Sequence, residues 1–285
     1  MAGQTPRRSG EAEDRAVSEA ETPVLSQLQV DSPRNPRANA AWVRHWWECE
    51  PSLIFCRANQ WRGEGSVHKI EPVLSDLWPQ YGLTIVTPRL ELRLPREEEL
   101  AELAQLAGIG VHGPDERPFL TPWTDGGPED RARFVLQGHW SRLGAWSAAA
   151  WQLGLGVFHH GDPLGMVTLR ARDFTIVREV TTSAWLGVEH QRKGYGTEAR
   201  VGLLTLAFDH LDARAALTEV FQDNHASQGV SRKLGYEPDG ISVDARGDEV
   251  LVSDRLRLTR ETWTRQTRPE TRVEGMAVCL PMFGL

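Results

Sequence analysis

The residues best suited to chemistry lie in a polar turn that carries two glycines, at residues 189–197. The turn reads Glu-His-Gln-Arg-Lys-Gly-Tyr-Gly-Thr and follows a stretch whose Thr, Trp and Val content predicts a strand. Apolar residues spaced by three and four after the turn predict a helix. Glycine lets backbone amides approach a ligand closely, and a helix N-terminus attracts anions. The turn is therefore a candidate phosphate cradle.

Two other interpretations of this turn remain open on the glycines alone. Residues 194–199 fit the G-x-G-x-x-A pattern of dinucleotide-binding folds, with Glu219 at about the distance of a ribose-binding acid. However, the polar residues 189–193 separate the predicted strand from Gly194, whereas a dinucleotide-binding turn follows its strand directly. A plain surface turn is the other alternative, because glycine turns are common.

A second polar segment covers residues 224–236 and follows a predicted strand at residues 217–221. Asn224 occupies the position of a helix N-cap, and Ser227 and Ser231 follow it on the predicted helix. The segment closes with Lys-Leu-Gly-Tyr.

Together these segments resemble the GNAT superfamily of N-acetyltransferases. Residues 191–196 resemble its Q/R-x-x-G-x-G/A pyrophosphate loop, and residues 224–236 resemble its second cofactor-contacting helix with the strand after it. Residues 87–93, Thr-Pro-Arg-Leu-Glu-Leu-Arg, resemble the opening strand of the branch that acetylates ribosomal-protein N-termini, the RimJ/RimL-like branch. The resemblance covers about residues 82–260. It implies an α/β (α+β) fold with a mixed, mostly antiparallel central sheet and helices on both faces.

The resemblance also implies acetyl-CoA as co-substrate, with direct transfer of its acetyl group to a primary amine in a ternary complex. The strand edge at Leu186–Val188 would pair with the pantetheine arm, and the Val188 amide would hold the acetyl carbonyl. The diphosphate would bind the amides of residues 192–197. Asn224 would reach a pantetheine amide, or would only cap its helix. The expected cofactor-binding residues are Leu186, Val188, Gln191, Arg192, Lys193, Gly194, Tyr195, Gly196, Thr197, Asn224 and Ser227.

Acetyl transfer to an alkylammonium needs a general base, because the ammonium pKa lies near ~10. Glu179 is the candidate, although its odd spacing from Val188 puts the two on opposite faces of a regular strand, and a plain strand residue is the alternative. Two histidines in a predicted turn, His159 and His160, are weaker candidates. Many family members have a tyrosine as general acid seven residues after the asparagine, whereas this chain has Ser231, as the RimJ/RimL-like branch does. Ser231 is either that acid or an ordinary helix residue.

Acceptor specificity is expected from residues 118–125, and three tryptophans, Trp123, Trp140 and Trp146, could shape the acceptor pocket. For the two helical tryptophans, ordinary core packing is the favoured alternative. The first acceptor hypothesis is a peptide N-terminus, and the second is a small-molecule amine of the antibiotic type. A module that binds acetyl-CoA without turnover is a third hypothesis. Glu198 and Arg200 are expected to be solvated helix residues.

Charge, cysteine content and hydropathy limit the partners and the cellular compartment that we expect. A net charge of −7 and a pI near 5.8 argue against nucleic-acid binding. Three scattered cysteines form neither a disulfide framework nor a metal motif, so we expect no metal and a reducing, cytoplasmic compartment. No apolar run approaches the length of a membrane span, and no hydrophobic signal core begins the chain.

The sequence divides into four predicted parts. Residues 1–40 are predicted to be disordered, because Gly, Pro, Ser, Arg and Glu are frequent and no aromatic residue occurs. Residues 41–81 form an extension of uncertain role, and residues 82–260 form the catalytic domain. The apolar tail at residues 261–285 is expected to dock on the domain or on a partner subunit, so a homodimer is one expectation.

Within the domain, the pattern predicts strands and helices in mixed order. The predicted strands cover residues 83–94, 151–158, 164–169 and 176–188, with a closing hairpin at residues 241–258. A helix opens at residues 95–99 and runs through Leu106, and another begins at Pro128 and continues through Trp146.

Overall fold

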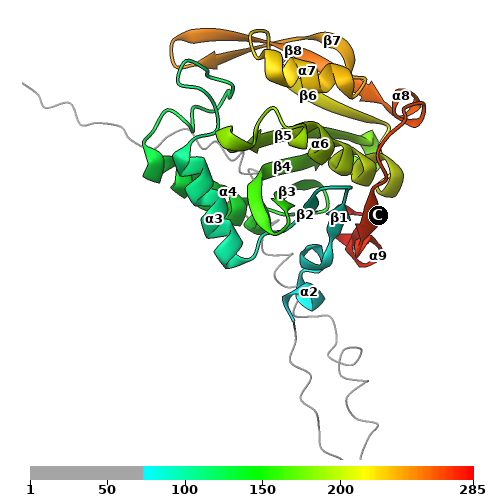
Figure 1. Ribbon diagram of the computed structural model, residues 1–285. Helices are drawn as coiled ribbons and strands as arrows, with labels where there is room; N and C mark the ends of the chain where they lie inside the picture. Colours follow the sequence, from blue (N-terminus) through cyan, green and yellow to red (C-terminus); the bar gives the residue numbers. More distant parts are fainter. Residues whose placement is uncertain (1–72) are drawn as a thin grey trace, which may run out of the picture. The chain divides into compact units, whose positions relative to one another are not determined.

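The computed structural model describes residues 73–285. The predictions for residues 1–40, and for residues 41–72 of the uncertain extension, lie outside these described residues. In the described part, nine strands form one sheet in the order β7-β8-β6-β5-β4-β3-β2-β1-β9 (Figure 1). All neighbouring strands are antiparallel except β5 and β6, which are parallel. The predicted mixed, mostly antiparallel sheet is confirmed.

The first predicted strand, residues 83–94, is a hairpin of two short strands. These are β1 (Thr84–Val86) and β2 (Glu91–Arg93), and they pair antiparallel. The Thr87 amide donates to the Leu90 carbonyl at 2.9 Å, which closes the turn around Pro88. Proline has no amide proton and a fixed φ, so it favours this turn over a continuous strand.

Three long strands follow: β3 (Ala150–His159), β4 (Asp162–Arg172) and β5 (Glu179–Leu186). The prediction of one strand over residues 176–188 was too long at both ends. Its start belongs to the helical turn α5 (Phe174–Val177), after which Arg178 turns the chain with φ 58°. Its end belongs to the 3-10 turn η2 (Val188–His190).

Strand β5 pairs with β6 (Ala215–Phe221) over only three residues, from Glu179–Ala215 to Thr181–Leu217. On its other side, β5 stays paired with β4 as far as Leu186. The two parallel strands therefore diverge after Thr181. The remaining sheet beyond β6 is the hairpin of β7 (Glu237–Arg246) and β8 (Glu249–Thr259).

Helices cover both faces of the sheet, as predicted (Figure 1). Helices α3 (Glu97–Ile109) and α4 (Pro128–Gly144) pack over a core that contains Leu103, Phe158 and Met166. The other face carries α6 (Tyr195–Thr205), which widens into the π-helical turn η3 (Leu206–His210), and α7 (His225–Lys233). Helix α4 ends at Gly144, so Trp146 lies just beyond it rather than on it as predicted.

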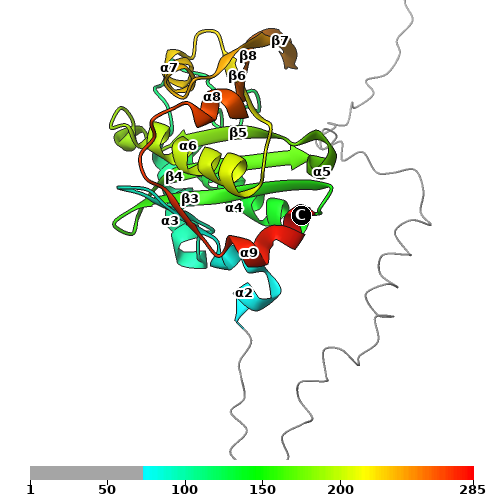
Figure 2. The same ribbon diagram turned by 90° about the vertical axis from the view of Figure 1, so that its right-hand side faces the viewer.

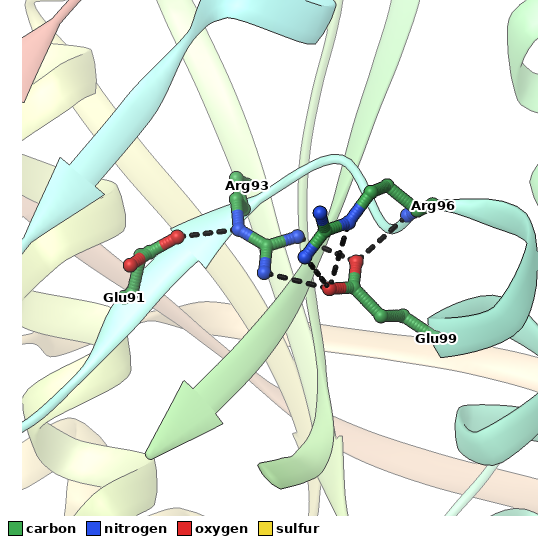
Figure 3. Close-up of polar contacts among 4 residues, drawn as sticks. All are labelled: Glu91, Arg93, Arg96 and Glu99. Atoms are coloured by element: carbon green, nitrogen blue, oxygen red, sulfur yellow. Dashed lines mark hydrogen bonds and ion pairs between the residues drawn. The ribbon is translucent and has the colours of Figure 1, made fainter. Parts of the chain in front are cut away.

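A carboxylate clamp joins β2 to the start of α3 (Figure 3). Arg93 Nη1 donates to Glu99 Oε2 at 2.6 Å, and Arg96 Nη2 donates to Glu99 Oε1 at 2.7 Å. The Arg96 backbone amide also donates to Glu99 Oε2 at 2.8 Å, which caps the helix N-terminus. Hydrogen bonds from Arg93 outweigh the effect of burial and lower the pKa of Glu99 to about 2. The clamp therefore orients α3 against the sheet.

The C-terminal residues lie on the domain itself (Figure 2). After α8 (Arg260–Thr264), strand β9 (Arg272–Glu274) pairs with β1 at the sheet edge. The chain then forms α9 (Met276–Cys279) and the 3-10 turn η4 (Leu280–Phe283). Phe283 is fully buried against Trp146 and Trp151. Two short N-terminal turns, α2 (Leu74–Leu77) and η1 (Pro79–Gly82), complete the described elements.

Candidate active site

The glycine turn forms a cradle of free backbone amides at the start of α6. Gly194 is the helix N-cap, with φ 83°, and no side chain caps the helix. The amides of residues 192–197 have no hydrogen-bond acceptor among residues 73–285. Arg192 has φ 61°, so residues 192 and 194 are both left-handed, and residue 193 between them is not. This alternation curves the backbone into a concave nest. Such a nest at a helix N-terminus binds an anion.

The Arg89–Glu198 pair ties this cradle to the β1–β2 turn. Glu198 accepts from Arg89 Nε at 2.6 Å, from the Arg89 amide at 2.8 Å and from the Thr87 hydroxyl at 2.8 Å. Burial alone would raise the pKa of Glu198, but these hydrogen bonds bring it below its usual value. Arg89 also donates to the Lys193 carbonyl at 3.2 Å and stacks over the Tyr195 ring at 4.7 Å. The pair thus holds the cradle in place.

A second set of contacts joins the strand end to the loop after α3. The Gln191 side-chain amide donates to the carbonyls of Val111 at 2.7 Å and Leu186 at 3.1 Å. The Val188 amide donates to the Gly110 carbonyl at 3.1 Å. The Gln191 side chain is therefore a brace, and the Val188 amide is already occupied. The prediction that this amide holds the acetyl carbonyl does not fit this arrangement.

The divergence of β5 from β6 leaves an open strand edge that leads away from the cradle. Ser183 and Ala184, in the middle of β5, are exposed, whereas Thr182 at the point of divergence is buried. The Thr218 hydroxyl of β6 donates to the Thr182 carbonyl at 3.3 Å. This is the last hydrogen bond between the two strands before they separate. An extended chain with amide groups could pair with such an edge.

Helix α7 places the second motif beside this edge. Asn224 Oδ1 accepts from the Ser227 amide at 3.0 Å, so Asn224 is an N-cap, and its amide nitrogen is left to donate elsewhere. Ser231 is fully buried, and its Oγ accepts from Arg200 Nη1 at 3.5 Å. Ser231 can touch a substrate only if that packing opens when a ligand enters.

Glu179 lies at the opposite end of β5 from the cradle. Its Oε1 accepts from Arg257 Nη1 at 2.5 Å, and Arg257 also donates to Asp239 at 3.1 Å. The rise of a strand, ~3.3 Å per residue, puts Glu179 about 23 Å from Leu186. The Glu179 carboxylate is therefore engaged by a guanidinium and does not face the cradle.

The residues expected to contact the acceptor fall into two groups. Trp123 lies against Phe119, Phe134 and Trp185, with ring centroids 5.1, 5.1 and 6.0 Å away, so the loop at residues 118–125 packs on β5. Arg246 of β7 donates to the Phe119 carbonyl at 3.3 Å and anchors the loop on the far side.

The two other tryptophans lie elsewhere. Trp140 is exposed on α4. The indole of Trp146 donates to the Met282 carbonyl at 2.8 Å and packs on the C-terminal segment, which agrees with the core-packing alternative rather than with a role at the acceptor site. His159 contacts the Arg89 carbonyl and the Tyr195 ring, beside the cradle.

Sequence reasoning missed the burial of Glu198 and Arg200, whose exposed fractions are only 9% and 5%. The sequence did contain a sign that Arg200 is buried. Leu203, Leu204 and Ala207 follow it at three, four and seven residues, the spacing of one helix face, and all are buried. The apolar face of α6 therefore extends to position 200.

Residues 73–285 show neither a metal-type cluster of side chains nor a helix suited to a membrane. No group of three or more His, Cys, Asp or Glu residues in this part of the chain has the arrangement of a metal site. None of the helices described there is both long and apolar enough to cross a membrane.

A sheet with one diverging parallel pair, and an amide cradle at the end of that divergence, define an acyltransferase class of fold. The family model described as "Acetyltransferase (GNAT) domain" matches residues 89–237, more than half of the chain. The chain therefore belongs to the GNAT acetyltransferase family and is an acyltransferase.

Two solved structures agree with this fold, and a third, RimL, is reported with them. A GCN5-related N-acetyltransferase from Brucella melitensis aligns with a TM-score of 0.51 and 15% identity, over 64% of this chain and 80% of that chain. A GNAT-family acetyltransferase from Bacillus anthracis aligns with a TM-score of 0.50 and 15% identity, over 62% and 99%. RimL, the ribosomal L7/L12 alpha-N-protein acetyltransferase, in complex with coenzyme A, aligns with a TM-score of 0.48 and 17% identity, over 62% and 97%.

Proposed function

We propose that this protein transfers the acetyl group of acetyl-CoA to a primary amine, with a peptide N-terminus as the preferred acceptor. The observation that carries the proposal is the set of free amides at residues 192–197, placed where the β5 edge opens. Free amides around a helix N-terminus suit a diphosphate, and an open strand edge suits the amides of pantetheine. The exposed side chains of Arg192 and Lys193 add positive charge at the cradle.

Acetyl-CoA supplies an acetyl thioester, which is activated toward attack by an amine. In the proposal, the cradle amides hold its diphosphate, and the amide nitrogen of Asn224 donates to the pantetheine arm. The thioester would then lie on β5 between the cradle and the point of divergence. The buried side chains of Thr182 and Thr218 would close the far end of this edge.

Direct transfer is favoured over an acetyl-enzyme. Cys279 is the one cysteine in the described part of the chain, and it is fully buried in the C-terminal segment. Burial raises the pKa of its thiol to about 11, so it carries little thiolate at neutral pH. Initial velocities measured at several concentrations of both substrates should therefore give intersecting rather than parallel double-reciprocal lines.

Ser231 is proposed as the general acid that protonates the departing thiolate, and Glu179 as the source of base. Because Glu179 is paired with Arg257, it would act through a chain of water molecules rather than by contact with the amine. The acceptor would approach across the aromatic group Phe119, Trp123 and Trp185.

The proposal is tested by release of free CoA thiol from acetyl-CoA in the presence of a panel of amines. The panel contains peptides with different first residues, the same peptides with blocked N-termini, and aminocyclitol antibiotics. Release with free but not blocked peptides, with the acetyl group on the N-terminus by mass spectrometry, would support the proposal. Release only with aminocyclitols would move the acceptor to small molecules. If acetyl-CoA bound but no CoA thiol were released with any amine, the protein would be a non-catalytic acetyl-CoA-binding module.

A further inference from the structure

Arg200 is a buried cation without an anionic partner. It lies on the inner face of α6, with 5% of its surface exposed. No Asp or Glu within residues 73–285 forms an ion pair with it, and its Nε has no hydrogen-bond partner there. A buried charge costs several kcal/mol unless polar groups hold it. The groups around Arg200 therefore indicate its role.

Those groups converge where β5 and β6 separate. Arg200 Nη2 donates to the Thr182 hydroxyl at 2.8 Å, and Nη1 donates to Ser231 Oγ at 3.5 Å. Its guanidinium stacks on the Tyr236 ring at 5.2 Å, and the Tyr236 hydroxyl lies 3.3 Å from the Thr182 hydroxyl. Arg200 thus links α6, α7 and β5 at one point, next to the last β5–β6 contact.

The reacting end of the co-substrate would lie beside this cluster. With the diphosphate in the cradle, an extended pantetheine arm of roughly 15 Å covers four to five strand residues at ~3.3 Å each. Counted back along β5 from Leu186, that distance ends close to Thr182 and Ser183. The distance therefore brings the thioester sulfur to the point of divergence, where Arg200 and Ser231 meet.

A guanidinium can only donate hydrogen bonds, so Ser231 Oγ must accept from Arg200. The hydroxyl proton of Ser231 then points away from Arg200 and is free to be donated. The positive charge also stabilises negative charge on Oγ. We propose that Arg200 is a positioning residue that makes Ser231 an effective acid for the departing thiolate. The inference rests on the proposed acetyltransferase function and deepens it.

The proton balance of the step is closed. Once the packing over Ser231 has opened to the bound co-substrate, the O–H bond of Ser231 breaks while an S–H bond forms on the departing CoA sulfur. The serine oxygen, held beside Arg200 while it is negative, recovers the proton that the acceptor nitrogen loses on becoming an amide. Arg200 itself keeps all its protons throughout.

The test is a double-mutant cycle in kcat with Arg200→Leu, Ser231→Ala and the double variant, and with Arg200→Lys as the conservative change. Leucine replaces a buried charge with an apolar side chain, which is often neutral or stabilising, so folding should survive. Thermal unfolding and binding of CoA provide the check on folding. We expect each single variant to lower kcat roughly 100-fold or more with little change in KM for acetyl-CoA. The double variant should be no slower than Ser231→Ala, and Arg200→Lys should recover part of the loss.

Additive losses, an unchanged kcat in either single variant, or a loss confined to KM would overturn the inference while the acetyltransferase function stands. A second measurement does not need turnover. The pKa of the bound CoA thiol, followed by the ultraviolet absorbance of its thiolate, should be lower in the wild type than in Arg200→Leu or Ser231→Ala. Equal values in all three proteins would overturn the inference even if no acceptor were found.

Discussion

Replacement of Gly194 by alanine tests the amide cradle directly. Gly194 has φ 83°, a conformation that costs an L residue ~1–2 kcal/mol. The added Cβ would lie 3.3 Å from Arg89 Nη2, the mobile end of a long side chain, so backbone strain rather than this contact dominates. Relief of the strain rotates the loop, and the amides of residues 192–197 then no longer point at one anion.

The expected loss of affinity follows from these hydrogen bonds. If two charge-assisted bonds of about 1.5–3 kcal/mol each are lost, the Kd for CoA rises roughly 100-fold or more. Isothermal titration calorimetry with CoA measures the change without any need for an acceptor. Urea unfolding of the same samples should show a loss of about 1–2 kcal/mol from the strained backbone.

Gly247→Ala is the matched control. Gly247 has φ 60° in the β7–β8 turn, and an added Cβ there meets nothing within 4 Å. The same backbone strain should lower stability by a similar amount and leave the Kd for CoA unchanged. If Gly194→Ala lost stability like the control and still bound CoA within about threefold of the wild type, the cradle would not be the diphosphate site.

Three further predictions concern buried ionisable groups. Glu198→Ala leaves the Arg89 amide without its acceptor, while the Thr87 hydroxyl keeps only its longer bond to the Leu90 carbonyl. The free energy of unfolding in urea should therefore fall by about 1–3 kcal/mol, and a loss below about 0.5 kcal/mol would contradict the bracing role. Burial lowers the pKa of His139 from 6.5 to about 4, so the unfolded state binds a proton that the folded state does not, and stability should fall as the pH drops from 6.5 to 4. His139→Leu should remove that slope, and a wild-type curve that is flat in this range would refute the argument. Two arginines lower the pKa of Glu99 from 4.5 to about 2, so its contribution to the free energy of unfolding is present above pH 4.5 and is lost as the pH falls toward 2. Glu99→Gln should flatten the pH dependence of unfolding only between these two values.

Much of the fold could be predicted because local pattern and global structure agree. The long strands β3 and β4, the helix α3 and the helix that begins at Pro128 follow from apolar spacing and from helix-start residues. Errors concentrate at the ends of elements. Two features shorten β5: the left-handed backbone of Arg178 before it, and the hydrogen bond from the Val188 amide to the Gly110 carbonyl after it. Strand propensity predicts neither feature.

The site was predictable where backbone atoms form it. Glycines and a helix start specify free amides locally, so the cradle at residues 192–197 follows from spacing alone. Side-chain roles were less accessible. Gln191 is a brace because its partner Val111 is 80 residues away in the sequence, whereas the cap formed by Asn224 with Ser227 is local and was among the expectations.

The sequence alone determined the cradle and its family, since a turn and the helix after it are local and their residue types restrict φ, ψ and free donors. The tertiary structure decided what surrounds the reacting end. Arg200 is an ordinary polar residue of a helix until α6, α7 and β5 meet and bury it against Thr182 and Ser231. Burial and the partners of a charge depend on contacts between segments far apart in the chain, and spacing within one segment does not report them.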